Sequence, residues 1–260
     1  MATRILLAGA TGVVGRRLMP LLKSSGYDVF GTTRRAEKVA ALEKAGTTPL
    51  VVDVFDALAL SAALLKIRPE IIIHQLTDLP TDLDPRKMRV GIERNARIRR
   101  EGTRNLIDAA MAAGARRFIA QSIAWAYAPG PEPHEEIDPL DYAAVEPRSI
   151  TVGGVVALES AVLRATGMQP IVLRYGRLYG SGTANDAPPD PRLSVHVDAA
   201  ARAAFLAIPY GTAGVYNIAE QDAAVTSAKA RRDLLWSPNY RLQNDREHSL
   251  GTLRLISRRQ

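Results

Sequence analysis

Three glycines near the start of the chain have the spacing of a loop that binds phosphate groups. Gly9, Gly12 and Gly15 follow a continuous apolar run, residues 4–10, and precede a helical pattern at 13–24. In such a strand–turn–helix unit the first glycine permits the tight turn and the second lets the backbone approach a pyrophosphate. The third lets helix and strand pack closely. The expected phosphate contacts are Gly9, Thr11, Gly12, Val13, Val14 and Gly15.

The end of the second expected strand indicates which dinucleotide binds. A site for NAD(H) places Asp or Glu there to hold the ribose 2′-hydroxyl. This chain instead has Thr33, Arg34 and Arg35, and arginine binds a phosphate in a bidentate manner. The sequence therefore favours NADP(H) over NAD(H), although NAD stays possible. Alternatively, the two arginines begin a solvated helix.

The ends of later strands supply the remaining cofactor candidates, which are Asp53, Val54, Gln75, Leu76 and Arg174. Asp53 is suited to accept a hydrogen bond from the adenine amino group, or to cap the turn before a helix at Ala57. Arg174 is suited to a phosphate or carboxylate, or to a structural pairing with a helix end. Both alternatives stay open for each residue.

Strand and helix signals alternate along the first two thirds of the chain. Apolar strand patterns occur at 4–10, 27–33, 50–55, 70–75, 117–122 and 169–174. Helical patterns at 13–24, 36–45 and 102–113 are each followed by a glycine suited to a left-handed cap. This alternation predicts an α/β fold with a doubly wound parallel sheet of the Rossmann type.

With these motifs in place, the chain resembles the short-chain dehydrogenase/reductase superfamily, in its extended and atypical branch of NAD(P)-dependent epimerases and dehydratases. The likeness spans roughly residues 3–237, and its further segments are 101–110, 118–122, 173–180, 196–200 and 214–217. It implies a dinucleotide-binding domain over 1–176. It also implies a small, abbreviated C-terminal substrate lobe over 177–260, with segment 196–219 interleaved with the main domain.

The chain departs from this family at the catalytic pair. The family uses a tyrosine as general acid and base, with a lysine four residues later that lowers its pKa. Aligned through Glu159, these positions hold Thr151 and Val155, and none of the eight tyrosines has a lysine four residues later. The resemblance leaves Ser122 as the residue that polarises a carbonyl. Tyr127, Thr151 and the loop residue His134 are the remaining catalytic candidates.

Two functions follow from these observations. The first is an NAD(P)-dependent oxidoreductase or epimerase-like enzyme that acts on a carbonyl or alcohol of a small molecule or sugar derivative. The abbreviated lobe makes a nucleotide sugar doubtful and favours a smaller carbonyl compound. The second is a non-catalytic NADP(H)-binding sensor or regulatory protein of the same fold.

Composition excludes several other classes. The chain has no cysteine and four scattered histidines, so we expect no metal centre. The net charge of +7 comes almost entirely from arginine, and the densest basic cluster lies at 86–104. That stretch, interpreted as a loop followed by a helix, lacks stacking aromatics, so a solvated face or subunit contact is favoured over nucleic-acid binding. We expect a cytoplasmic protein without membrane association, since the N-terminus has no signal-peptide pattern. The family resemblance implies a homodimer.

Overall fold

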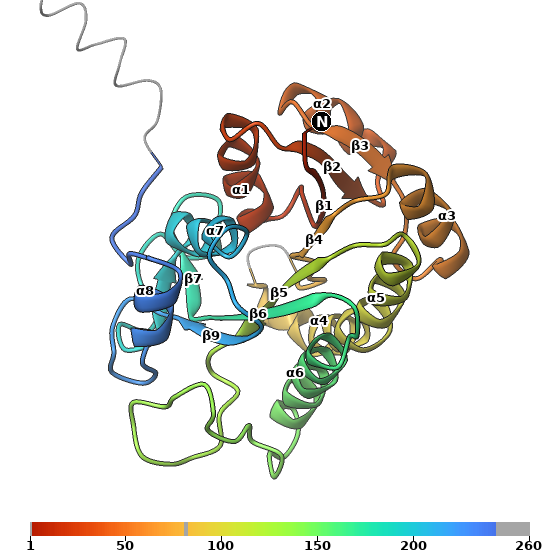
Figure 1. Cartoon of the computed structure of the whole chain (residues 1–260). Coiled ribbons are helices and arrows are strands. Elements are labelled where there is room, and N and C mark those ends of the chain that lie inside the picture. Colours follow the sequence, from red (N-terminus) through yellow and green to blue (C-terminus); the bar gives the residue numbers. More distant parts are fainter. Residues whose placement is uncertain (1, 81–82, 243–260) are drawn as a thin grey trace, which may run out of the picture.

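Seven parallel strands form the central sheet of the computed structural model, which describes residues 2–80 and 83–242 (Figure 1). Their order across the sheet is β3-β2-β1-β4-β5-β6-β9. The strands are β1 (Arg4–Ala8), β2 (Asp28–Thr33), β3 (Thr48–Val51), β4 (Ile71–His74), β5 (Arg117–Ile123), β6 (Gln169–Tyr175) and β9 (Gly214–Ile218). All six neighbouring pairs are parallel. This topology confirms the predicted doubly wound Rossmann-type fold.

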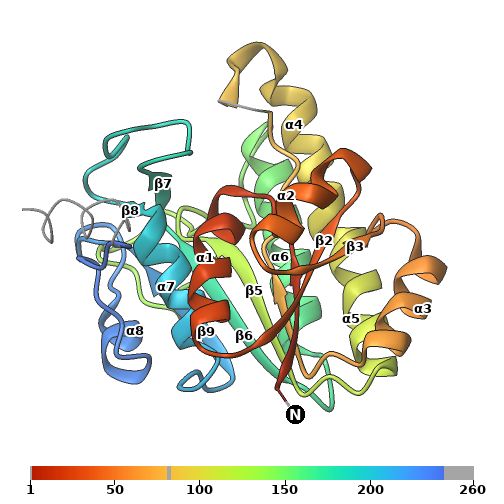
Figure 2. The same ribbon diagram turned by 90° about the horizontal axis from the view of Figure 1, so that it is seen from above.

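Helices cover both faces of the sheet (Figures 1 and 2). The first face carries α1 (Val13–Ser24), α2 (Val39–Lys44) and α7 (Val197–Leu206). The opposite face carries α3 (Ala57–Ile67), α5 (Thr103–Ala112) and α6 (Arg148–Leu163). Helix α4 (Pro85–Arg97) packs along α6, and its amino-terminal end extends away from the sheet (Figure 2). Strands β7 (Arg177–Tyr179) and β8 (Ser194–His196) pair separately, and α8 (Ala228–Asp233) is the last helix of the described residues.

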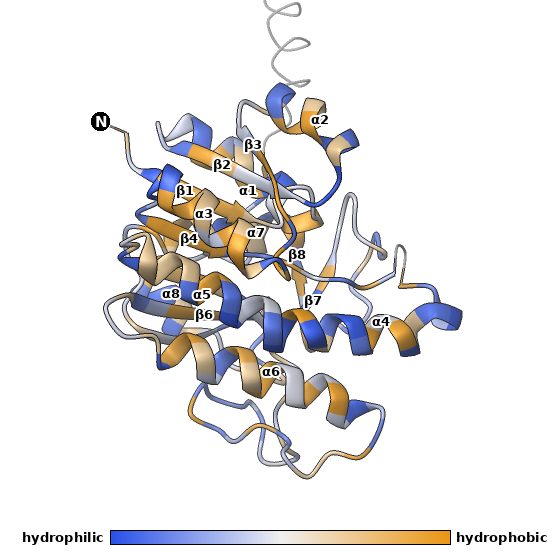
Figure 3. Ribbon diagram, turned by 90° about the vertical axis from the view of Figure 1, so that its right-hand side faces the viewer, coloured by the Kyte–Doolittle hydropathy of each residue, from blue (hydrophilic) through white to orange (hydrophobic). Residues whose placement is uncertain are grey.

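Alternating side chains along the strands build two cores. In β4, Ile73 packs with the α1 and α7 side, whereas Ile72 packs with the α3 and α5 side, and both are fully buried. Strands β1 and β4 are accordingly among the most hydrophobic segments (Figure 3). A parallel strand buried on both faces needs this continuous apolar run, which is why the sequence pattern identified these strands.

One segment differs from the sequence interpretation. Residues 86–104, expected to be a loop followed by a helix, are helical from Pro85 onward. The Asp84 side chain caps α4 by accepting a hydrogen bond from the backbone N–H of Arg86. The buried face of α4 consists only of Gly91, Asn95 and Ala96. These three small or polar residues among many arginines do not form an apolar helical pattern that the sequence could reveal.

The C-terminal third of the chain contributes directly to the main sheet. Helix α7 and strand β9 lie within its layers, and β9 forms one edge. Trp236, which follows α8, is buried and donates a hydrogen bond to the Ala199 carbonyl over 2.8 Å. The proposed division into two domains stays a prediction, and the end of the expected basic tail, 243–260, lies outside the described residues. None of the described helices is long and apolar enough to cross a membrane.

We predict that Phe118→Ala lowers the free energy of unfolding by about 3–5 kcal/mol, because Phe118 is fully buried in the second core and its loss leaves a cavity. Urea denaturation measures this change. Leu58→Ala is the matched control, since Leu58 is 86% exposed; it should change the free energy by no more than about 0.5 kcal/mol. Equal effects of the two substitutions would contradict the assigned core.

Candidate functional site

The three-glycine loop connects β1 to α1 through close backbone contacts. Gly9 has φ +90°, and a Cβ atom there would lie 2.6 Å from the Gln75 carbonyl oxygen. A Cβ atom at Gly15 would lie 2.3 Å from the Gly9 carbonyl oxygen. Neither distance is possible for a real side chain, so the first and third glycines are sterically required. Gly12 is exposed, which leaves its surface open for a ligand to approach.

The first turn of α1 is suited to hold an anion. Its N-cap, Gly12, has no side chain that could accept a hydrogen bond from the free backbone N–H groups of that turn, and the turn contains no acidic residue. The free N–H groups and the positive end of the helix dipole therefore favour a phosphate. Val14 is 3% exposed with its side chain in the core, so only its backbone is available to a ligand. These features fit a dinucleotide pyrophosphate.

The end of β2 places polar groups beside this loop. The Thr32 hydroxyl accepts a hydrogen bond from the Gly9 backbone N–H over 3.3 Å. The Thr33 hydroxyl, largely buried, accepts one from the Arg35 backbone N–H over 3.1 Å. Thr33 thus shapes the turn that presents the two arginines.

Arg34 is half-exposed and forms an ion pair with Asp78 over 3.0 Å. Arg94 of α4 lies 3.7 Å from the other carboxylate oxygen of Asp78. The backbone N–H of Asp78 donates to the buried Asn95 side chain over 3.0 Å, which fixes its loop. Sequence reasoning missed Asp78 and Arg94 here because nothing in the sequence shows that Asp78 and Arg94 lie beside the end of β2.

The structure separates two roles that the sequence left open near β3. Asp56, rather than Asp53, caps α3, by accepting a hydrogen bond from the Ala59 backbone N–H over 2.9 Å. Asp53 is exposed, and one of its carboxylate oxygens accepts from the Phe55 backbone N–H over 3.0 Å. Its contact with adenine stays a prediction. The neighbouring Val54 carbonyl accepts from Asn105.

Gln75 directly follows β4 and carries a buried hydrogen-bond acceptor. It is 5% exposed, and its amide group donates to the Tyr175 hydroxyl over 3.4 Å. Its side-chain oxygen has no hydrogen-bond partner among the described residues. A buried unpaired oxygen is costly, so this atom is suited to a donor supplied by a ligand. Leu76 borders it, and its backbone N–H donates to the His74 ring.

Ser122 and Arg174 are brought together by a third residue, Glu159 of α6. The Ser122 hydroxyl donates to Glu159 Oε1 over 2.6 Å, and the Arg174 guanidinium binds both carboxylate oxygens over 2.9 and 2.6 Å. All three residues are at most 4% exposed. Of the two alternatives for Arg174, this geometry supports the structural pairing. The partner, Glu159, lies in the interior of α6 rather than at the end of a helix. The expected contact of Ser122 with a carbonyl stays a prediction, and here its hydroxyl has another partner.

Tyr127 is also held inside the protein. Its hydroxyl donates to Asn217 Oδ1 and accepts from Arg174, each over 2.7 Å. Its ring stacks on His134, with centroids 4.9 Å apart. Burial raises the pKa of Tyr127. These contacts favour a structural role over proton transfer at neutral pH.

The positions of the family's catalytic pair lack its chemistry. Val155, at the lysine position, is fully buried in an apolar cluster with Tyr127, Leu140 and Val152. Thr151, at the tyrosine position, is half-buried, with no hydrogen bond to its hydroxyl among residues 2–80 and 83–242. An apolar cluster has no means to lower the pKa of a hydroxyl, so Thr151 has no activating partner here.

A buried arginine near the end of β4 was missed by the sequence analysis. Arg99, grouped there with solvated or subunit-contact arginines, is only 6% exposed and lies in the π-helical segment Ile98–Gly102. Burial lowers its pKa to about 10. Within the described part of the chain no hydrogen bond or ion pair satisfies its guanidinium. Burial, reinforced by the Arg99 charge, also lowers the pKa of His74 to about 4, which places the guanidinium near the carboxyl end of β4.

Comparisons with known proteins agree with this geometry. A model of the NAD dependent epimerase/dehydratase family matches residues 5–238. A 3-diazoavenalumate denitrifying reductase from a Streptomyces species is 39% identical over 229 residues, covering 87% of this chain and 71% of that protein. UDP-glucose 4-epimerase of Thermotoga maritima, solved with UDP-glucose, superposes with a TM-score of 0.73 at 20% identity, covering 98% of this chain and 99% of that one. WbmG of Bordetella bronchiseptica, solved with NAD, gives 0.71 at 16% identity, covering 96% and 94%. The two structural likenesses concern the fold alone.

We predict that acid destabilises the protein through His74. Its pKa is lowered from 6.5 to about 4 in the folded state, so the unfolded chain binds more protons between these pH values. The free energy of unfolding should therefore decrease as pH falls through that window, by about 3 kcal/mol. Urea denaturation at pH 7 and pH 4.5 measures it. His74→Asn should remove most of this decrease, whereas the control His134→Asn should retain it; an unchanged decrease in His74→Asn would contradict the assignment.

Proposed function

The chain belongs to the NAD-dependent epimerase/dehydratase family, and from that membership we propose that it is an NADPH-dependent reductase of a small-molecule diazo compound. At the family level its function is that of an NAD(P)-dependent oxidoreductase or epimerase-like protein. The observation that carries the finer proposal is the replacement of the catalytic pair by Thr151 and the fully buried Val155. Reduction of a carbonyl needs a proton donor, which this pair does not supply.

The preference for NADP(H) is supported by charge at the end of β2. The guanidinium groups of the half-exposed Arg34 and of Arg94 both face the single carboxylate of Asp78. Two guanidinium groups against one carboxylate, with Arg35 next in the sequence, favour an additional anion such as a 2′-phosphate. In this proposal Asp78 orients Arg34 and Arg94 toward that group.

The proposed reaction needs no proton donor. The 39% identical Streptomyces protein is named a denitrifying reductase of a diazo compound. When bound, NADPH supplies a hydride. Transfer of that hydride to the carbon of an aryl diazonium group forms a C–H bond, breaks the C–N bond and releases N₂ with the bonding electron pair. No oxygen has to be protonated, so the lack of a tyrosine–lysine pair is no obstacle.

Residues of this chain would then bind and orient rather than exchange protons. The buried Gln75 side-chain oxygen, which has no hydrogen-bond partner among the described residues, is an acceptor that a donor group of the cofactor would reach after a local shift. Arg99, a buried cation without a partner among the described residues, is suited to an anionic oxygen of the substrate. The apolar cluster around Val155 supplies no group that could exchange a proton. The expected homodimer stays a prediction.

We predict that Arg34→Gln weakens NADPH binding by about 10-fold or more, the effect of losing one charge-assisted contact to the 2′-phosphate. NADH binding should change by less than about twofold, since NADH lacks that phosphate. Fluorescence titration at fixed salt measures both. Arg86→Gln, on a fully solvated side chain at the start of α4, is the matched control and should alter neither. Equal losses for NADPH and NADH would contradict the 2′-phosphate assignment.

The reaction is tested with a matched pair of probes, 4-carboxybenzenediazonium and 4-carboxybenzaldehyde, in the presence of NADPH deuterated at C4. We expect enzyme-dependent formation of deuterated benzoate and N₂ from the first, at least 100-fold faster than reduction of the aldehyde. The reaction without protein is subtracted. Arg99→Gln should raise the KM for the diazonium probe, with NADPH affinity unchanged.

Three results would overturn the proposal. Reduction of the aldehyde at a comparable rate would indicate ordinary carbonyl chemistry with another proton donor. Tight NADPH binding with neither probe reduced would favour the non-catalytic sensor. Benzoate formed without deuterium would exclude hydride transfer from the cofactor.

A further inference from the structure

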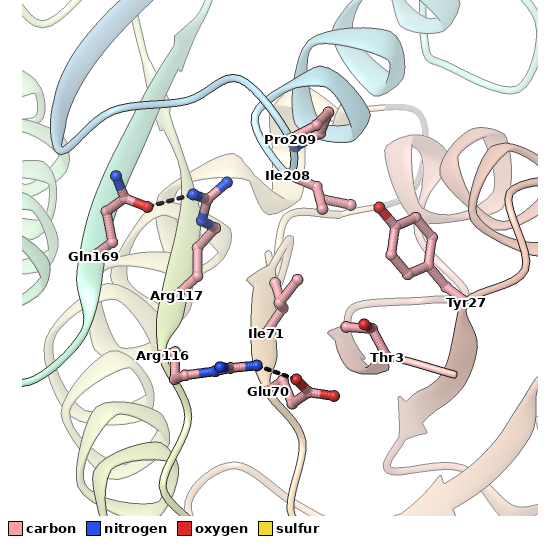
Figure 4. Close-up of a pocket in the computed structure, with 9 residues that line it drawn as sticks. All are labelled: Thr3, Tyr27, Glu70, Ile71, Arg116, Arg117, Gln169, Ile208 and Pro209. Carbon is pink, nitrogen blue, oxygen red and sulfur yellow. Dashed lines mark hydrogen bonds and ion pairs between the residues drawn. The ribbon is translucent and has the colours of Figure 1, made fainter. Parts of the chain in front are cut away.

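A cavity of about 340 Å³ lies at the amino ends of the central strands, at the opposite end of the sheet from the glycine loop (Figure 4). Thr3 precedes β1, Ile71 begins β4, Arg117 begins β5 and Gln169 begins β6, so four adjacent strands contribute their amino ends. Gly9 follows the carboxyl end of β1, which a five-residue strand separates from this edge by roughly 15 Å. The volume falls in the range of roughly 300–1,000 Å³ common for small-molecule sites. This cavity is therefore separate from the cofactor cleft.

Arg117 is the central polar group of the cavity. Its guanidinium donates to the Ala207 carbonyl over 2.8 Å and to the Gln169 side-chain oxygen. Two of its five N–H groups are thereby used, and both acceptors are uncharged. No carboxylate lies within ion-pairing distance of it in the described residues, and burial lowers its pKa. The charge is held in place, but it is not neutralised.

The neighbouring arginine differs in this respect. Arg116 is exposed and pairs with Glu70 at the rim of the cavity, as Figure 4 shows. That pair cancels its own charge, which leaves Arg117 as the net positive charge of the lining. An anion is the ligand that this lining favours.

The remaining walls are apolar or carry hydroxyl groups. Ile71, Ile208 and Pro209 supply aliphatic surface, and the Tyr27 ring stands across the space from Arg117 (Figure 4). The hydroxyls of Tyr27 and Thr3 make no hydrogen bond within the described chain. A ligand with an apolar body and one anionic end matches this distribution, whereas a bare inorganic anion leaves the aliphatic walls without contact.

We propose that this cavity is a second ligand site, which binds a small organic carboxylate through Arg117 and Tyr27. The carboxylate accepts the unused guanidinium N–H groups, and the body of the ligand packs between Ile71 and Ile208. The site does not depend on the proposed reductase activity, because none of its residues lines the cofactor loop.

Isothermal titration of the full chain with benzoate tests the site, with benzamide as a neutral analogue and inorganic phosphate as an anion without an apolar body. We expect benzoate to bind with saturating NADPH present, and at least 10-fold more tightly than either comparison compound. Arg117→Gln should weaken benzoate at least 10-fold. Arg116→Gln, the matched control, should stay within about twofold, because its charge is already paired.

A second pair of variants covers the case in which Arg117→Gln does not fold. Thr3→Asp places a carboxylate at the cavity wall and should abolish benzoate binding. Thr3→Asn introduces a side chain of the same shape as Asp without the charge, and should retain binding. The proposal is overturned if benzoate produces no saturable heat, if benzamide binds equally well, or if NADPH displaces benzoate. It is equally overturned if Arg117→Gln folds and binds benzoate as the unaltered protein does.

Discussion

The buried ion pair between Glu159 and Arg174 is the interaction on which the centre of the molecule depends. It joins α6 to β6, and through Ser122 it also joins β5. Through a further hydrogen bond, Arg174 holds Tyr127 and with it the loop after β5. Removing one partner of a buried pair costs about 3–5 kcal/mol, because the other charge is left uncompensated. The pair therefore fixes the position of the helix that carries Thr151, beside the cofactor cleft.

This arrangement explains how the family's scaffold persists without its usual acid–base pair. The cofactor loop relies on backbone approach at Gly9 and Gly15, and the sheet relies on its two cores. Neither uses the residue at position 155. With Val155 at this position an apolar cluster is extended and no charge is left buried, so the fold tolerates the absence of the lysine.

Arginines without a hydrogen-bonded carboxylate among the described residues occur at both ends of the sheet. Arg99 acts on His74 at the carboxyl end of β4, and Glu159, whose charge acts on Arg99, is already paired with Arg174. Arg117 lies at the amino end of β5. A guanidinium removed from water without a carboxylate is unfavourable for stability alone. Most arginines within residues 2–80 and 83–242, such as Arg97 with Glu101, have an acidic partner or are solvated. The exceptions are where ligand anions are favoured.

The sequence by itself determined the features that depend on neighbouring residues along the chain. The glycine spacing at 9–15, the apolar strands and the doubly wound parallel type of the sheet follow from local sterics and from burial on both faces. The absence of a tyrosine–lysine pair is visible in the residues alone. The tertiary structure decided which polar side chains meet. Ser122 lies 37 residues from Glu159, and Asp78 lies 44 residues from Arg34. An arginine's burial and charge compensation depend on such distant contacts, because partners are supplied by packing and not by the local pattern.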